Sequence, residues 1–141
     1  MKIKTSSTKE TQTLASQIAK QIKNGGVVAL YGKLGAGKTI FAQGFAKDLG
    51  ISEKIISPTF VLIRQHLIPN TKQIFYHIDL YRLEDTKGIG IEEIINNKEN
   101  IVLIEWADRL ENLPKNAIKI TIEKLSADQR QITIENPAGF L

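Results

Sequence analysis

The chain has 141 residues, of which 42% are hydrophobic and 24% are charged, and its formal net charge is +4. These values are ordinary for a globular protein, so we expect residues 1–141 to form a single domain. The apolar runs are too short to cross a membrane, and the absence of cysteine excludes disulfides and thiolate zinc sites. No basic segment followed by an apolar one opens the chain, so we expect a cytoplasmic protein.

The first element expected along the chain is a helix. Ser7 and Glu10 have the spacing of a capping box, in which two side chains bond backbone N–H groups at the helix start. Apolar side chains then recur at helical spacing, at Leu14, Ile18 and Ile22. The helix should run to about Lys23, because the Asn-Gly-Gly stretch that follows favours a helix end.

A phosphate-binding loop is expected next. Residues 27–31 are typical of a short buried strand, and Phe41–Leu49 of an amphipathic helix that closes near Gly50. Between them, residues 32–39 match the pattern G-x-x-x-x-G-K-[ST] in full. In such a loop the backbone N–H groups surround phosphates, and the glycines permit close approach. We expect Lys38 to reach the β- and γ-phosphates and the Thr39 hydroxyl to bind Mg²⁺, so the chain should bind a nucleoside triphosphate.

The rest of the chain predicts a mixed sheet. Pro58 favours a loop, because proline disfavours helical geometry at the residue before it. Three strands and a short helix are expected, at 60–66, 74–78, 101–104 and 91–96 respectively. Residues 118–122 and 131–135 alternate apolar and polar side chains, so they should pair as a hairpin with one solvent-facing side. We therefore predict an α/β protein with a P-loop NTPase fold, a mixed central sheet flanked by helices and an antiparallel C-terminal hairpin.

A loop that holds Mg²⁺ also needs a carboxylate at the end of a neighbouring strand. Glu105 ends the apolar run at 101–104, and Asp79 ends the strand that begins at Ile74. The spacing does not rank these two residues, and both can approach the metal, one of them through water.

Five further side chains allow two interpretations each. Thr59 follows a Ser-Pro pair and is placed to bond the γ-phosphate or its metal, although such turns are common. His77 lies within a strand, where histidine is more often packed or hydrogen-bonded than a base or ligand. Arg82 and Arg130 are candidate phosphate partners because guanidinium binds phosphate through two bonds, but surface arginines are commoner. Trp106 is at least as consistent with a core or interface position as with a nucleotide contact.

The phosphate loop and several further strings resemble one family. The strings that follow the loop, in order, are Ser57–Phe60, His77–Leu83 and Ile104–Trp106. Together they resemble the TsaE family (formerly YjeE), the small ATPases of bacterial tRNA threonylcarbamoyladenosine synthesis. Glu10-Thr11 and Arg130 also match the pattern of that family. The loop alone is widespread, whereas this combination is specific and spans nearly the whole chain.

The resemblance implies roles for the matching residues. Those implied to contact the nucleotide through the loop are Leu34, Gly35, Ala36, Gly37, Lys38, Thr39 and Ile40. Those implied at its adenosine end are Glu10, Thr11 and Arg130. Thr39 and Glu105 would bind Mg²⁺, with Asp79 near the metal and orienting water. The catalytic residues would be Lys38, Asp79 and Thr59, the last in a switch-like loop over the γ-phosphate.

The resemblance also implies a function and partners. The chain would bind ATP and Mg²⁺, hydrolyse ATP slowly when alone, and reset a complex of the TsaD and TsaB proteins. Those proteins transfer a threonylcarbamoyl group to adenosine in tRNAs that read ANN codons, so the resemblance implies tRNA as an indirect partner and no membrane. The net charge of +4 is too mild to decide whether the chain also contacts tRNA directly. Lys33 departs from the family, which usually has Asp there, but the position is a variable one and phosphate binding should survive.

Two other functions are compatible with the loop. One is a P-loop kinase, against which the chain is short and has no evident arginine-bearing lid. The other is a nucleotide-sensing module that switches a partner by binding alone.

Overall fold

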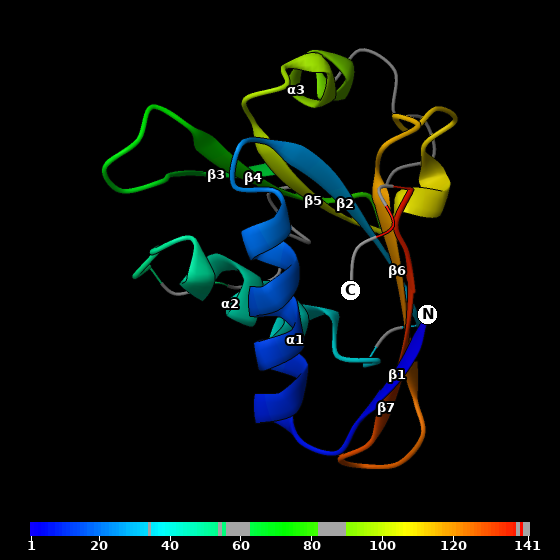
Figure 1. The fold of residues 1–141 in the computed structure, drawn as a ribbon. Helices are drawn as coiled ribbons and strands as arrows, with labels where there is room; N and C mark the ends of the chain where they lie inside the picture. The colour runs from blue at the N-terminus through cyan, green and yellow to red at the C-terminus, as the bar shows by residue number, and fades with distance from the viewer. Residues whose placement is uncertain (34, 54, 56–62, 82–89, 138, 140–141) are drawn as a thin grey trace.

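The computed structural model describes residues 1–33, 35–53, 55, 63–81, 90–137 and 139. Within these residues one sheet has seven strands in the order β1-β7-β6-β2-β5-β4-β3 (Figure 1). The strands are β1 (Lys2–Thr5), β2 (Gly26–Tyr31), β3 (Ile63–Leu67), β4 (Ile74–Asp79), β5 (Ile101–Glu105), β6 (Ile118–Lys124) and β7 (Arg130–Glu135). The helices are α1 (Thr8–Gln21), α2 (Lys38–Asp48) and α3 (Ile91–Asn96), with a 3₁₀ turn η1 (Ala107–Arg109).

The predicted α/β fold with a mixed sheet and a C-terminal antiparallel hairpin is confirmed. At the predicted capping box, the Ser7 hydroxyl accepts from the N–H of Glu10 at 3.1 Å, and the Glu10 carboxylate accepts from the N–H of Ser6 at 3.0 Å. Strand β1 was not predicted, because Ile3 is the only large apolar residue in Lys2–Thr5 and the strand forms by pairing with β7 at the sheet edge. The predicted strand at 60–66 is described only from Ile63 onwards.

The middle of the sheet is parallel, which places the ends of several strands at one edge. Strand β2 pairs in parallel with both β5 and β6, and β5 pairs in parallel with β4. In this register Leu30 is opposite Glu105, and Glu105 is opposite Asp79. The carboxyl ends of β2, β5 and β4 therefore lie side by side. The glycine-rich loop begins directly after the end of β2.

Two apolar layers enclose the central strands. Helices α1 and α2 lie together on one face of the sheet (Figure 1), where Phe41, Phe45 and Ile18 pack against Phe75 and Leu103. On the other face, the side chains of α3 and η1 pack on the alternate positions of β2 and β5. Every residue of β5 is buried, which explains its nearly continuous apolar sequence. Among the described helices none is long and apolar enough to span a membrane.

The contact between α1 and α2 depends on Gly44. A Cβ atom added at Gly44 would lie 2.5 Å from the carbonyl oxygen of Gln12 and 2.6 Å from its Cα. Both atoms belong to the α1 backbone, so the two helices approach this closely only because residue 44 has no side chain.

We predict that Gly44→Ala lowers the free energy of unfolding, measured by urea denaturation. Overpacking of this kind costs about 1–3 kcal/mol, whereas the higher helix propensity of alanine stabilises the helix by about 1 kcal/mol. Because the clash is with backbone atoms, we expect the cost of overpacking to exceed the gain in helix propensity. Lys47→Ala, at an exposed position of the same helix, is the control and should change stability little. A stabilised Gly44→Ala protein would show that the helices can separate at no cost.

Candidate functional site

The glycine-rich loop passes from the end of β2 to the start of α2. Gly35 and Gly37 have φ values of 78° and 110°, a left-handed geometry that side chains with a Cβ rarely adopt. Gly37 is the N-cap of α2, and no described side chain caps the N–H groups of the first turn. Uncapped N–H groups at a helix start, aided by the helix dipole, bind anions. The predicted loop therefore has the backbone geometry of a phosphate site.

Lys38, the first residue of α2, is held inside this loop and is only 6% exposed. Its ammonium group donates a hydrogen bond to the carbonyl of Gly32 at 2.6 Å. Burial lowers the pKa of Lys38, while the negative charges of Glu105, Asp79 and Asp108 act in the opposite direction. The loop lysine is thus in the electrostatic field of both strand-end carboxylates that the sequence singled out.

Those two carboxylates lie next to each other across the parallel β4–β5 pair. Asp79 is 4% exposed and Glu105 is 2% exposed, and the two residues are directly opposed in register. The Oδ1 atom of Asp79 accepts from the N–H of Tyr81 at 2.9 Å. Glu105 accepts a hydrogen bond from His77 at 2.5 Å through its Oε2 atom. Buried charges are costly when unpaired, so the opposite charge of Lys38 offsets part of the cost of both carboxylates.

The donor set at this edge suits a magnesium ion that is bound together with phosphate. Among the described residues, no three His, Asp or Glu side chains are grouped to hold a metal by themselves. Mg²⁺ does not require such a group, because it keeps several waters and takes one or two carboxylates plus substrate phosphates. The Thr39 hydroxyl, which directly follows Lys38 in the chain, and the carboxylates of Glu105 and Asp79 would be the oxygen donors of such a site.

Trp106 covers the ammonium of Lys38. Its ring centroid lies 3.9 Å from the Lys38 Nζ atom, a cation–π contact, and its ring packs against Tyr81 with centroids 4.8 Å apart. The backbone of Trp106 has φ 58° and ψ 45°, left-handed values that are uncommon for a residue with a side chain. The turn after β5 thus brings the indole over the loop lysine, and Trp106 lies at this site rather than solely in the core.

Arg130 connects the β6–β7 hairpin to the glycine-rich loop. Its Nε atom donates to the carbonyl of Ala36 at 2.7 Å. Its NH1 atom donates to the hairpin carbonyls of Ser126, Ala127 and Gln129, at 2.9 to 3.2 Å. The guanidinium group therefore bonds the loop and the hairpin turn at the same time, and it fixes the carbonyl just before Gly37.

The residues implied at the adenosine end are partly brought together. Thr11 and Arg130 line one small recess, together with Asp128 and the loop residues Gly37 and Ile40. The Thr11 hydroxyl is hydrogen-bonded to Thr5 at 2.8 Å. Glu10 does not line this recess, and its carboxylate is bonded to the nearby backbone as part of the capping box. Leu34, Thr59 and Arg82 lie outside the described residues.

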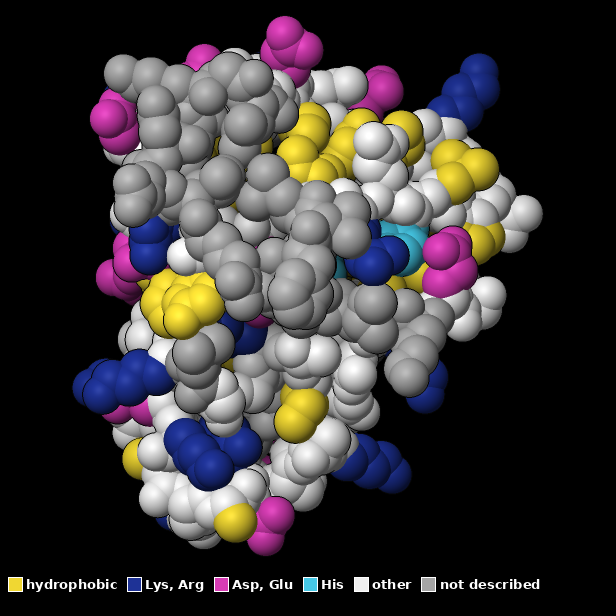
Figure 2. All heavy atoms as spheres, turned by 180° about the vertical axis from the view of Figure 1, so that it is seen from behind, with side chains coloured by type: hydrophobic (Ala, Val, Ile, Leu, Met, Phe, Trp, Pro, Cys, Tyr) yellow, Lys and Arg dark blue, Asp and Glu magenta, His cyan; other side chains and the backbone are white. Residues whose placement is uncertain are grey.

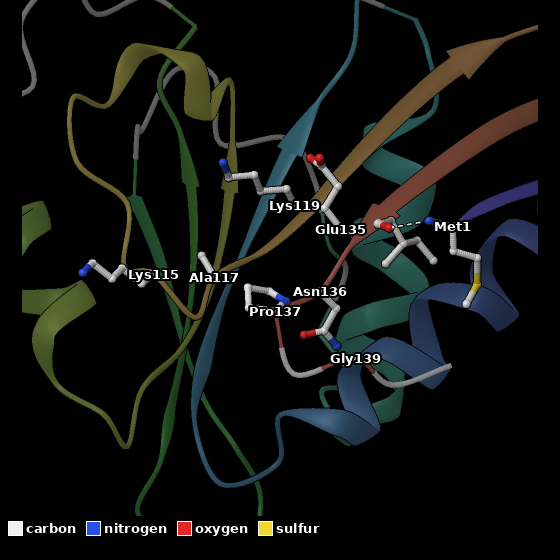
Figure 3. Close-up of a pocket in the computed structure, with 9 residues that line it drawn as sticks. Met1, Lys115, Ala117, Lys119, Glu135, Asn136, Pro137 and Gly139 are labelled. Atoms are coloured by element: carbon white, nitrogen blue, oxygen red, sulfur yellow. Dashed lines mark hydrogen bonds between the residues drawn. The ribbon is translucent and has the colours of Figure 1, made fainter.

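A larger cavity lies away from all of these residues. It has a volume of about 620 Å³ and is lined by the start of β6, the end of β7 and the N-terminal Met1, whose amino group donates to the Ile134 carbonyl at 3.0 Å (Figure 3). Because β6 is parallel to β2, its first residues are at the sheet edge opposite Glu105. The cavity lacks the glycine loop, the carboxylates and Lys38, so it is not the site that the sequence predicted.

Two contacts at the site were not predicted from the sequence. The His77–Glu105 hydrogen bond confirms that His77 is a hydrogen-bonded residue, but its partner depends on the β4–β5 register. The period-two alternation that puts His77 and Asp79 on one face of β4 was the available signal. The bond from Arg130 to Ala36 spans 94 residues and has no local signal.

These features define a class of protein. A strand, a G-x-x-x-x-G-K-[ST] loop and a helix, with acidic residues at the ends of adjacent parallel strands, make this chain a member of the P-loop NTPase fold class. The family model described as "Threonylcarbamoyl adenosine biosynthesis protein TsaE" matches residues 5–132, so the chain belongs to the TsaE family.

Individual relatives and a solved structure agree with this assignment. The chain is 38% identical over 138 residues to the tRNA threonylcarbamoyladenosine biosynthesis protein TsaE of Bacillus subtilis, covering 94% of this chain and 84% of the relative. It is 36% identical to the protein of the same name from Treponema pallidum, with 91% and 95% covered. The crystal structure of Bacillus subtilis YdiB superposes with a TM-score of 0.80 at 34% identity, with 96% of this chain and 84% of that one covered.

We predict that Arg130→Lys loosens the glycine-rich loop, because a lysine cannot bond Ala36 and the hairpin carbonyls together. Hydrogen bonds to charged groups contribute about 1.5–3 kcal/mol each. Because the hydrogen bonds of Arg130 are half-buried, their loss should lower the free energy of unfolding by about 1–2 kcal/mol. Amide hydrogen exchange of residues 35–39 should also become faster in the nucleotide-free protein. The control is Lys124→Gln, which alters the exposed residue opposite Arg130 on β6. Unchanged loop exchange in Arg130→Lys would contradict this role.

Proposed function

We propose that the chain is the ATPase component of the machinery that makes threonylcarbamoyladenosine in tRNA. One observation carries the proposal: the loop lysine Lys38 and the carboxylates of Glu105 and Asp79 lie at one sheet edge, buried and electrostatically coupled. Such an arrangement in a member of the TsaE family suits the binding of ATP with Mg²⁺.

Nucleotide binding in this proposal changes the partners of Lys38. The ammonium of Lys38 is bonded to Gly32 and covered by Trp106. When ATP binds, Lys38 exchanges the Gly32 carbonyl for β- and γ-phosphate oxygens, and the N–H groups of the loop from residue 34 to residue 40 surround the phosphates. Thr11 and Arg130, with the nearby Glu10, then contact the adenosine end.

Hydrolysis in this proposal depends on positioning and charge. A magnesium ion held by Thr39 and Glu105, with Asp79 close by, would neutralise charge on the phosphate oxygens. The Asp79 carboxylate, fixed by its bond to the N–H of Tyr81, orients the attacking water. Thr59 contributes from its loop to the γ-phosphate. The guanidinium of Arg130 is engaged with backbone carbonyls, and Arg82, which lies outside the described residues, would have to be recruited to compensate transition-state charge, so hydrolysis by the chain alone should be slow.

The proposed partners are the TsaD and TsaB proteins, which the ATPase would reset between turnovers. The names of the relatives support this pathway, since they are described as tRNA threonylcarbamoyladenosine biosynthesis proteins. We propose that contact with tRNA is indirect. On the face shown in Figure 2, the described Lys and Arg side chains lie in several separate places, with acidic side chains beside some of them. On this face, charge dispersed in this way does not make the continuous basic surface that favours nucleic acid.

We expect the purified chain to hydrolyse ATP slowly, and addition of a TsaD–TsaB complex to stimulate hydrolysis. The partner is expected to act through Thr59, which lies outside the described residues, and so to complete the site around the γ-phosphate. Phosphate release would be measured for the chain alone, for the complex alone and for the mixture. Lys38→Ala is the matched control and should abolish the stimulation, because it removes the cation that contacts the phosphates.

Other outcomes would redirect the proposal. Rapid turnover by the chain alone, or stimulation that persists in Lys38→Ala, would contradict the assigned mechanism. Tight ATP binding without any stimulation would favour a sensor that acts by binding or a kinase. A phosphorylated product in a panel of small metabolites would identify the kinase.

A further inference from the structure

The buried side chain of His77 makes one hydrogen bond to the part of the chain that the structure describes. It lies on β4 and is 0% exposed, and its Nε2 atom is 2.5 Å from the Oε2 atom of Glu105. Its Nδ1 atom is buried and has no hydrogen-bond partner among the described residues. An unsatisfied buried nitrogen costs free energy, and an apolar side chain of similar size would avoid that cost. Packing alone therefore does not account for a histidine at this position.

The contacts around the ring fix its plane and the position of its proton. The imidazole stacks on Phe75, with the ring planes 14° apart and the centroids separated by 6.2 Å. A carboxylate can only accept a hydrogen bond, so the Nε2 atom carries the proton and donates it to Glu105. Phe75 thus orients the imidazole, and the imidazole restrains the Glu105 carboxylate.

This bond makes the two carboxylate oxygens of Glu105 unequal, because only Oε2 accepts from His77. Oε2 of Glu105 is occupied by His77, which leaves Oε1 as the oxygen available to a ligand. The side chain of Glu105 is 3% exposed, so few other rotamers are open to it. A carboxylate that is already held in place loses less conformational freedom when it binds a cation. Hydrogen-bonded outer residues of this kind commonly set the affinity of a metal site.

We propose that His77 is a positioning residue for divalent-cation binding: it holds Glu105 so that Oε1 is presented to the metal. The inference rests on the proposed function, because Glu105 is a metal ligand only there. It assigns to His77 no contact with nucleotide or metal and no proton transfer. Removing the hydrogen bond of His77 should lower the affinity for the divalent cation and leave nucleotide binding without metal unchanged.

The experiment measures Mn²⁺ binding to the protein in the presence of a non-hydrolysable ATP analogue, by electron paramagnetic resonance of free Mn²⁺. His77→Phe removes the donor but keeps an aromatic ring beside Phe75. Loss of a residue that hydrogen-bonds a metal ligand typically lowers the metal affinity about 10–100-fold, and we expect a loss of Mn²⁺ affinity of this order. His77→Gln, whose amide can donate near the position of Nε2, should recover most of the affinity. Binding of the analogue in EDTA should be unaltered in both variants.

One control and one replacement variant separate positioning from general damage. Phe75→Leu disturbs the stack but keeps the histidine donor, so it should lower stability while weakening Mn²⁺ binding less than His77→Phe does. If His77→Phe does not fold, as judged by circular dichroism, His77→Met replaces it in the same titration.

Each result decides the inference. A folded donor-free variant that binds Mn²⁺ as tightly as the wild-type protein overturns it and leaves the proposed function standing. An equal loss of analogue affinity with and without metal also overturns it, because His77 would then be needed only for the structure of the site. If the wild-type protein shows no metal-dependent analogue binding, the proposed function fails first and the inference falls with it.

Discussion

The parallel pairing of β2, β5 and β4 is the constraint on which the rest of the site depends. It places Leu30, Glu105 and Asp79 at the same level of the sheet, so that two acidic side chains follow buried strands at the edge from which the glycine-rich loop departs. A slip of one residue in either pairing would turn an acidic side chain to the other face of the sheet. The apolar residues of β5 are buried on both faces of the sheet. They oppose such a slip, because it would move each side chain from the apolar cluster on one face to the cluster on the other.

Once the register is set, the site is a balance of buried charges. Lys38, Asp79 and Glu105 are each less than 7% exposed, which would be unfavourable for any of them alone. Burial lowers the pKa of Lys38, and the neighbouring carboxylates act in the opposite direction. The ammonium also contacts the Gly32 carbonyl and the Trp106 ring. The neighbouring carboxylates, the Gly32 carbonyl and the Trp106 ring therefore offset part of the cost of burying this charge.

The elements that could be predicted from the sequence are those with local signals. The capping box located the start of α1, the loop motif located the junction of β2 and α2, and the apolar run located β5. Strand alternation located the β6–β7 hairpin. The carboxylates Asp79 and Glu105 could be named as candidates because each ends a strand, and the structure places them side by side.

What could not be predicted depends on partners distant in the chain. The strand order, with β6 beside β2, arises from long-range pairing. Strand β1 has too few apolar residues for a period-two signal and takes its conformation from β7. The partner of His77 follows from the β4–β5 register, and the contact of Arg130 with Ala36 follows from the return of the last hairpin to the loop. Local patterns therefore indicate the candidate site residues more readily than the residues that hold them in place.

Calorimetric titration of the wild-type chain with ATP would show whether this sheet edge binds ATP together with a divalent cation, as we propose. The titration would be made in Mg²⁺ and again in EDTA, with Lys38→Ala under both conditions. We predict one ATP per chain, tighter binding in Mg²⁺ than in EDTA, and loss of tight binding in Lys38→Ala. Absence of binding by the wild-type chain, or equal binding by the Lys38→Ala protein, would contradict it.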